Sequence, residues 1–264
     1  MILSVDWTRI VKLIERAERN GSLIGLAAIT PSGEQFGYNA DRRFVAASTV
    51  KIPIMVELFC QFDAGERSPL EHYRLRPEDR VAGSGVMLHL HDGMEFTLCD
   101  LAYLMISISD NTATNVLIDI VGMQRVNATM CRLGMTGSTL SRKMQGRATQ
   151  EIEKENWATP NDYARAIAAL LAHRAASSDA CAQMMAMLEK QQNDRRIARH
   201  LPRTGGPRWG SKTGSLTGVT NDVGFIVTDR GTLIISIFCE RQADPHLGEQ
   251  IIGDISRAAL EAVR

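Results

Sequence analysis

The spacing of apolar residues changes several times along the chain, and each change predicts a different element. Residues 1–22 place apolar side chains mostly on one side of a helix. Residues 22–44 predict two strands around a Pro-Ser-Gly-Glu turn. The next helix begins near Ser48 and runs to about Phe62. Residues 66–96 are rich in turn-forming residues and predict loops.

The middle of the chain predicts a block of helices. Thr97 and Asp100 have the spacing of a reciprocal capping pair at a helix start. A second helix ends at Gly122, and a third ends at Gly134. Thr159, followed by a proline in the first helical position, begins another helix.

The last quarter of the chain has a different pattern. Residues 208–216, 220–229 and 231–240 predict three strands, the last two joined by a tight turn. Residues 245–264 predict an amphipathic helix. Because strands are gathered at both ends and helices in between, the pattern favours an α+β fold over repeated strand–helix–strand units.

Composition narrows the possible functions. The chain has 264 residues, with 44% hydrophobic and 23% charged side chains, as in an ordinary soluble protein. Thirty basic and thirty acidic residues balance, so no net field favours nucleic acid or an anionic membrane. The apolar runs are too short to span a bilayer. Five scattered cysteines argue against a disulfide framework or a zinc ribbon.

The first residues lack the basic start, long apolar centre and cleavage site of a secretory leader. We therefore expect a protein that stays inside the cell, or a periplasmic or secreted protein whose leader has been removed. Nothing in the sequence indicates an oligomeric state.

Three short polar motifs interrupt the apolar pattern. Taken singly, each has an ordinary explanation as a helix cap, a turn or an exposed strand residue. Their order and spacing together are far more specific, because three chance patterns seldom follow one family order. The motifs are Ser48-Thr49-Val50-Lys51, Ser109-Asp110-Asn111 and Lys212-Thr213-Gly214.

With these motifs the chain resembles a class A β-lactamase-type serine hydrolase of the β-lactamase and penicillin-binding protein superfamily. The likeness covers nearly the whole length. It implies one domain over residues 1–264, with a mostly antiparallel five-stranded sheet flanked by the terminal helices, an α/β sandwich, plus an all-helical lobe. We place the α/β lobe at residues 1–63 with 191–264 and the helical lobe at residues 64–190, with the site between them.

The residues themselves support a nucleophilic role for Ser48. A serine hydroxyl is a weak nucleophile until a neighbouring group takes its proton. Residues three apart on a helix are neighbours, so Lys51 is within reach if its amine is neutral. Burial and a second cation both lower a lysine pKa, and Lys212 could be that cation. Pro53 removes the N–H that would bond the Thr49 carbonyl, so this first turn should be tight or irregular.

Other motif residues have expected roles in proton transfer and substrate binding. Ser109 is expected to relay a proton from Ser48 towards a leaving nitrogen. Asn111 offers an amide that can hold a substrate amide. Lys212 and Thr213 are expected to bind a substrate carboxylate.

The resemblance also implies an oxyanion hole, which needs two fixed donors. These would be the backbone N–H groups of Ser48 and Ser215, and Gly214 would let the strand approach the ligand. The expected partner is a small molecule, either a β-lactam or an acyl ester or peptide. No metal or organic cofactor is implied.

The resemblance fails at the loop that supplies the deacylating base. Class A β-lactamases carry a Glu-x-x-Leu-Asn motif, whose Glu activates the water that frees the acyl-enzyme. Alignment on Gly134 and Arg142 puts Met144 in place of that Glu. It puts Ala148 in place of the Asn, whereas Asn115, which braces this loop in the family, is present. Nearby carboxylates are expected to form a solvated charge run: Glu151, Glu153 and Glu155.

The three motifs therefore supply the residues expected for acylation, but the glutamate expected for deacylation is missing. We expect a serine hydrolase that opens β-lactam rings through acylation of Ser48 and releases the product slowly. Two alternatives stay open at this stage. One is a penicillin-binding, D,D-peptidase-like or esterase enzyme, and the other is a non-enzymatic β-lactam-binding sensor.

Two further stretches have ordinary interpretations. Residues 89–93, His-Leu-His-Asp-Gly, lack further histidines at a metal-binding spacing and predict a solvated loop. Residues 194–203 form a basic patch without interleaved aromatic residues, which favours a solvated surface over a nucleic-acid site.

Overall fold

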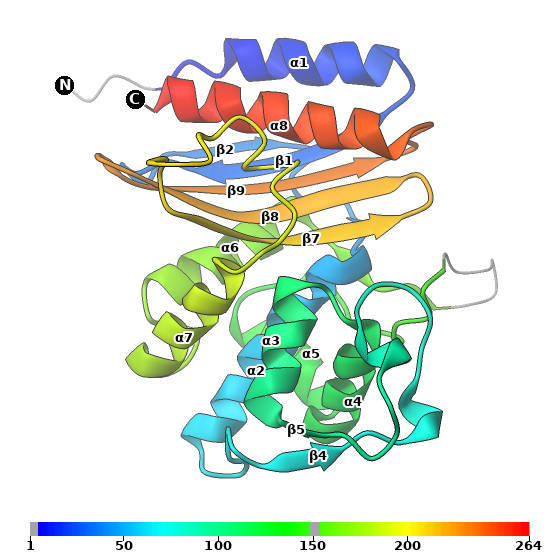
Figure 1. Ribbon diagram of the computed structural model, residues 1–264. Helices are drawn as coiled ribbons and strands as arrows, with labels where there is room; N and C mark the ends of the chain where they lie inside the picture. The colour runs from blue at the N-terminus through cyan, green and yellow to red at the C-terminus, as the bar shows by residue number, and fades with distance from the viewer. Residues whose placement is uncertain (1–4, 148–153, 264) are drawn as a thin grey trace.

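A five-stranded sheet lies at the centre of the fold (Figure 1). The computed structural model describes residues 5–147 and 154–263. The five strands are β1 (Leu23–Ile29), β2 (Gln35–Tyr38), β7 (Trp209–Leu216), β8 (Val219–Thr228) and β9 (Gly231–Glu240). Their order is β2-β1-β9-β8-β7, and every neighbouring pair is antiparallel. The predicted α+β class, with two early and three late strands, is confirmed.

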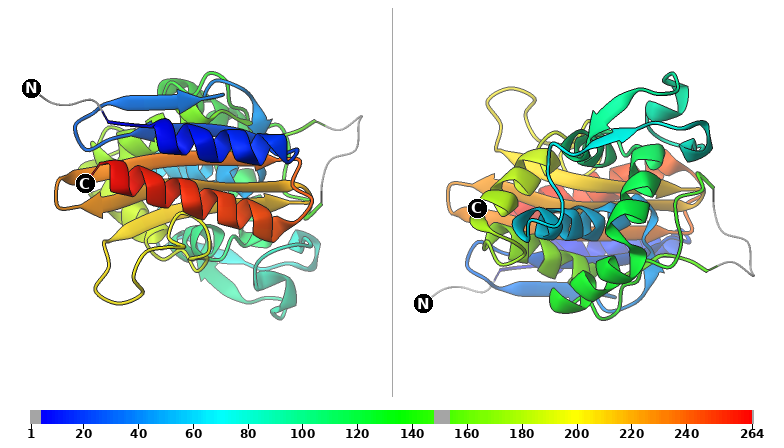
Figure 2. Two further views of the ribbon diagram at one scale, coloured as in Figure 1. Left: turned by 90° about the horizontal axis from the view of Figure 1, so that it is seen from above. Right: turned by 90° about the horizontal axis from the view of Figure 1, so that it is seen from below.

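The two terminal helices, α1 (Thr8–Arg19) and α8 (Pro245–Ala262), cover one face of the sheet. Figure 2 shows them side by side over the sheet. Their apolar stripes pack on the sheet, since Ile10, Ile14 and Ile255 share one buried cluster with residues of β8 and β9. The two ends of the chain therefore stabilise the same face.

The remaining helices lie on the opposite face (Figure 1). Helix α6 packs against β1, β8 and β9, and α7 packs against β7. Helix α2 is buried on nearly all sides, as expected for a helix without a polar face. The boundaries of the two predicted lobes stay a prediction. These helices are α2 (Lys51–Asp63), α3 (Leu98–Ser107), α4 (Asn111–Val121), α5 (Met123–Arg132), α6 (Pro160–Leu171) and α7 (Ser178–Leu188).

The predicted capping residues perform that function. Thr97 Oγ1 accepts a hydrogen bond from Asp100 N at 3.0 Å, and Asp100 Oδ2 accepts one from Thr97 N at 2.9 Å. Thr159 Oγ1 accepts from Asp162 N at 3.2 Å at the start of α6. Local sequence therefore sets where α3 and α6 begin.

Short elements complete the structure. Residues 66–96, predicted as loops, also contain a two-stranded ladder that the sequence analysis missed, because each strand is only three residues long. Within the described residues, no helix is both long and apolar enough to cross a membrane. The short elements are β3 (Phe44–Val45), β4 (His72–Arg74), β5 (Glu95–Thr97), β6 (Trp157–Ala158), η1 (Ala47–Val50), η2 (Pro77–Asp79) and η3 (Met87–His89), where η denotes a 3₁₀ helix.

Candidate active site

Ser48 lies in the 3₁₀ turn η1, immediately before α2 begins at Lys51. The tight first turn predicted from Pro53 is thus confirmed. Side chains three residues apart are eclipsed in a 3₁₀ helix, so this turn aligns Ser48 with Lys51. Ala47 has a φ of 47°, in the left-handed region that costs energy for a residue with a side chain. The backbone is therefore strained directly before Ser48.

Lys51 is completely buried, and its amine is surrounded by oxygen atoms. Its Nζ lies 2.7 Å from Ser109 O, 2.9 Å from Ser109 Oγ and 2.8 Å from Asn111 Oδ1. Burial lowers the pKa of Lys51 well below its usual range, and the nearby Lys212 lowers it further, whereas Asp110 raises it. The structure brings two predicted motifs together around one amine.

Asp110 fixes the turn that carries Ser109 and Asn111. Its buried carboxylate accepts hydrogen bonds from the backbone N–H groups of Val86 at 2.7 Å and Met87 at 2.8 Å. Its other oxygen accepts one from Ala113 N at 2.9 Å and caps α4. Asp110, to which the motif alone gave no role, thus holds the Ser109 turn against η3.

Ser109 is held in an unusual backbone conformation, with a φ of 60°. Its carbonyl accepts hydrogen bonds from both Lys51 Nζ and Ser84 Oγ, the latter at 2.8 Å. The Asn111 side chain bridges two segments, because its Oδ1 accepts from Lys51 and its Nδ2 donates to Ala82 O at 3.1 Å. Each amide and hydroxyl is thereby oriented before any substrate binds.

Strand β7 forms the edge of the sheet beside Ser48 and carries Lys212 to Ser215. Lys212 is fully buried, and its Nζ donates to Thr213 O at 2.9 Å. Burial lowers the pKa of Lys212 to about 7, with Asp222 opposing the shift and Arg196 adding to it. Near neutral pH, this lysine therefore exists in both charged and uncharged forms.

Gly214 allows β7 to approach the Ser48 turn closely. A side-chain carbon at this position would lie 3.0 Å from Ala46 O and 3.2 Å from Ser48 N. The close approach of this strand to the Ser48 turn is thus shown, and its close approach to a ligand stays a prediction. This contact puts the N–H of Ser48 beside β7, where the predicted second donor, Ser215, is located.

Arg196 is a residue that the sequence analysis missed. Residues 194–203 were predicted to be a solvated surface, and this is wrong for Arg196, which is buried. Its guanidinium donates to Ser215 Oγ at 2.6 Å and to Gly214 O at 2.9 Å. The sequence feature that could have indicated a buried arginine is Asp222, an aspartate within the apolar strand β8. A buried carboxylate is normally paired with a buried cation.

Two asparagine side chains hold the segment around Arg142 in place through hydrogen bonds to its backbone. Asn115 accepts from Met144 N at 2.8 Å and donates to Met144 O at 3.0 Å, so the predicted bracing role of Asn115 is confirmed. Asn156 Oδ1 accepts from the backbone N–H groups of Ser141 and Arg142 at 2.7 and 3.0 Å. Met144 is mostly buried and faces the cavity described below.

Glu155 corrects the expectation of a solvated charge run. It is 8% exposed, and Arg142 Nη2 lies 2.9 and 3.2 Å from its two carboxylate oxygens. This buried ion pair closes the base of the loop. The other positions considered in the loop, Ala148, Glu151 and Glu153, lie outside the described residues.

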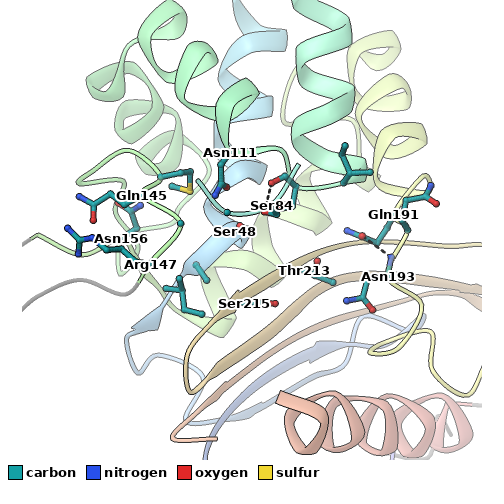
Figure 3. Close-up of a pocket in the computed structure, with 18 of the residues that line it drawn as sticks. Ser48, Ser84, Asn111, Gln145, Arg147, Asn156, Gln191, Asn193, Thr213 and Ser215 are labelled. Atoms are coloured by element: carbon teal, nitrogen blue, oxygen red, sulfur yellow. Dashed lines mark hydrogen bonds between the residues drawn. The ribbon is translucent and has the colours of Figure 1, made fainter. Parts of the chain in front are cut away.

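These elements surround a cavity of about 550 Å³. Figure 3 shows Ser48 between two sides, one carrying Gln145, Arg147 and Asn156, and the other carrying Gln191 and Asn193. In the part of the chain that the structure describes, no aromatic residue lines this cavity. The same part contains no cluster of three or more His, Cys, Asp or Glu residues that could hold a metal ion.

Comparison with known proteins agrees with this fold. A solved β-lactamase from Sphaerobacter thermophilus is 57% identical, covers 98% of each chain and superposes with a TM-score of 0.96. The class A β-lactamase of the last common ancestor of Gram-negative bacteria is 26% identical, covers 97% of this chain and 99% of its own, and gives a TM-score of 0.87. β-Lactamase OXY-2 of Klebsiella oxytoca is 25% identical over 96% of this chain and 88% of that protein.

The fold and these relatives define a serine hydrolase of the class A β-lactamase type. The sequence also matches a family profile over residues 7–263, almost its whole length. The chain belongs to the Beta-lactamase enzyme family. A small β-lactam is the substrate class that membership implies.

The lowered pKa of Lys212 predicts a pH-dependent affinity. Below about pH 7 its amine is a cation and attracts a substrate carboxylate, and above that pH the charge is lost. The dissociation constant of a penicillin before acylation should therefore rise as pH increases from 6 to 8.5, as measured by stopped-flow burst kinetics. The methyl ester of the same penicillin should show no such rise. Equal affinity of the free acid across this range would contradict the assignment.

Proposed function

We propose that the protein opens β-lactam rings through acylation of Ser48 and releases the acyl group slowly. The observation that carries the acylation step is the buried Lys51 amine, which lies one turn after Ser48 and within 2.9 Å of Ser109 Oγ. Burial lowers the pKa of this amine and so favours its uncharged form, which can accept a proton.

The proposed proton path combines the Lys51–Ser109 contact with the position of Ser48 one turn before Lys51. Lys51 Nζ accepts the Ser48 hydroxyl proton while Ser48 Oγ bonds to the lactam carbonyl carbon. The carbon–nitrogen bond of the ring then breaks, and the nitrogen takes a proton from Ser109 Oγ. Lys51 returns a proton to Ser109 across their 2.9 Å contact, so both residues regain their starting state.

Substrate binding uses the edge of β7. Lys212 and Thr213 attract the substrate carboxylate, and Ser215 Oγ, which accepts a hydrogen bond from Arg196, has its own proton available for donation. The backbone N–H groups of Ser48 and Ser215 stabilise the oxyanion. Asn111 donates its second amide N–H to the acyl side chain, since its first is bonded to Ala82 O.

Slow release is supported by the side chain at position 144. The loop places Met144 in the cavity, where the family pattern has a glutamate, and a thioether takes no proton at neutral pH. General-base assistance is typically worth about 10²–10⁴-fold in rate. Glu155 also lines the cavity, but its carboxylate is ion-paired with Arg142. The comparisons do not favour the peptidase, esterase or sensor alternatives.

Acylation should occur on Ser48. Incubation with benzylpenicillin should add one penicillin mass, and peptide mapping should place the adduct on the peptide that contains Ser48. Ser48→Ala should form no adduct and should hydrolyse no penicillin. An adduct on another residue, or unchanged hydrolysis by the variant, would refute the nucleophile assignment.

Lys51 should act through proton transfer and not merely through its charge. Lys51→Met should lower the acylation rate constant at saturating substrate by about 10²–10⁴-fold, because it removes the base. Lys51→Arg should be similarly slow, since a guanidinium keeps its proton. Wild-type rates in the arginine variant would show that positive charge alone is sufficient.

Replacing Met144 should change release more than acylation. With a chromogenic cephalosporin, the wild-type protein should show a burst of about one equivalent followed by a slow steady phase, as an accumulating acyl-enzyme does. Met144→Glu should accelerate the slow phase by roughly 10- to 100-fold, a part of the full general-base effect.

The matched control is Met144→Gln, which has nearly the same shape as the glutamate variant but takes no proton. It should leave the slow phase close to the wild-type rate. Equal acceleration by both variants would show that polarity or loop movement, and not a base, limits release. Linear wild-type turnover without a burst would refute slow release itself, and Glu155→Gln would then test the nearest described carboxylate.

A further inference from the structure

The side of the active-site cavity formed by residues 191–195 continues beyond the reacting groups. A second hollow of about 320 Å³ lies next to it, and Asp194 and Arg195 line both. The second hollow is otherwise lined by Ala198, Arg199, His200, Leu201 and Arg203. The basic residues of this segment were predicted to form a solvated surface, and the proposed acylation chemistry does not use the second hollow.

The covalent structure of a β-lactam determines which part of the substrate lies beside residues 191–195. The ring carbon that carries the carboxylate is bonded to the nitrogen that leaves. Figure 3 shows Thr213, a proposed carboxylate-binding residue, on the side of Gln191 and Asn193. Residues 191–195 therefore face whatever the leaving nitrogen carries, and the loop with Gln145 and Arg147 faces the acyl group. This orientation rests on the proposed function.

Positive charge exceeds negative charge along this continuation. Arg195 is 61% exposed, and its Nε lies 3.6 Å from Glu249, a carboxylate that also neutralises the buried Arg196. Arg203 Nη2 lies 3.5 Å from Asp194. Within the described residues, Arg199 forms no ion pair with a carboxylate. Three arginines line this hollow, Arg195, Arg199 and Arg203, and two carboxylates, Glu249 and Asp194, pair with them.

We propose that Arg195, with Arg199 behind it, selects substrates that carry a second anionic group on the leaving-group side. The first carboxylate binds at Lys212 and Thr213, and the second anion, a carboxylate or sulfonate, extends over Asp194 towards the basic hollow. Arginine forms directed, charge-assisted hydrogen bonds with such groups. The guanidinium Nη atoms of Arg195 form no hydrogen bonds with other described residues, so both are available.

Two cephalosporins provide a matched pair of probes. Both carry a 7-mandelamido group, and they differ only in a (1-methyltetrazolyl)thiomethyl or a (1-sulfomethyltetrazolyl)thiomethyl group at position 3. The second-order acylation rate constant should be roughly three- to tenfold larger for the sulfonate, as expected for a partly exposed ion pair. This ratio should fall towards one when ionic strength rises from about 0.05 to 0.5 M.

Substitutions connect that preference to Arg195. Arg195→Gln should bring the ratio close to one, and Arg195→Glu should make the sulfonate the slower substrate. Arg199→Gln should reduce the ratio by a smaller factor. Arg208→Gln is the matched control, because Arg208 is 62% exposed, pairs with one carboxylate, Glu189, and lines neither cavity. It removes the same charge and should keep the wild-type ratio.

The outcomes separate this proposal from the proposed function. Acylation by both cephalosporins at equal rates would overturn the anion preference and leave the acylation chemistry intact. An equal loss of preference in the Arg195 and Arg208 variants would also overturn it, since general charge and not a site would then explain the ratio. No acylation by either compound would overturn the proposed function and, with it, this extension.

Discussion

The burial of two lysine amines beside one serine is the constraint on which the site depends. Lys51 and Lys212 are both fully buried, and a buried ammonium without partners is very costly. Lys51 avoids this cost through a lowered pKa and through the oxygens of Ser109 and Asn111. The turn that supplies those oxygens is itself fixed by Asp110. A need for acceptors around one amine thus explains why the break between α3 and α4 lies where it does.

Lys212, the other buried amine, connects the site with the C-terminal helix on the opposite face of the sheet. The negative charge of Asp222, on the neighbouring strand β8, raises the pKa of Lys212 and so opposes the effect of burial. Asp222 also accepts a hydrogen bond from Ile197 N at 3.0 Å. The adjacent Arg196 lies between Ser215 and Glu249 of α8. The C-terminal helix therefore supports the edge strand that faces Ser48.

Sequence reasoning succeeded where a local rule decides the structure. The Thr97–Asp100 cap, the tight turn before Pro53 and the two-plus-three division of strands all follow from neighbouring residues. It failed where tertiary contacts decide. Arg196 has no local feature that separates it from the exposed arginines around it, and its guanidinium is held by distant residues of β7, β8 and α8, namely Gly214, Asn221 and Glu249. Glu155 likewise became a buried partner because the loop returns to Arg142.

The contacts that hold the loop around Met144 are independent of the residue that could act as a base at position 144. Its position is set by backbone hydrogen bonds to Asn115, by Asn156 and by the Arg142–Glu155 ion pair, and none of these involves the side chain at position 144. The side chain of Met144 packs on the core below and also lines the cavity. Because the loop is held without that side chain, its chemistry can change while the fold and the acylation groups stay fixed.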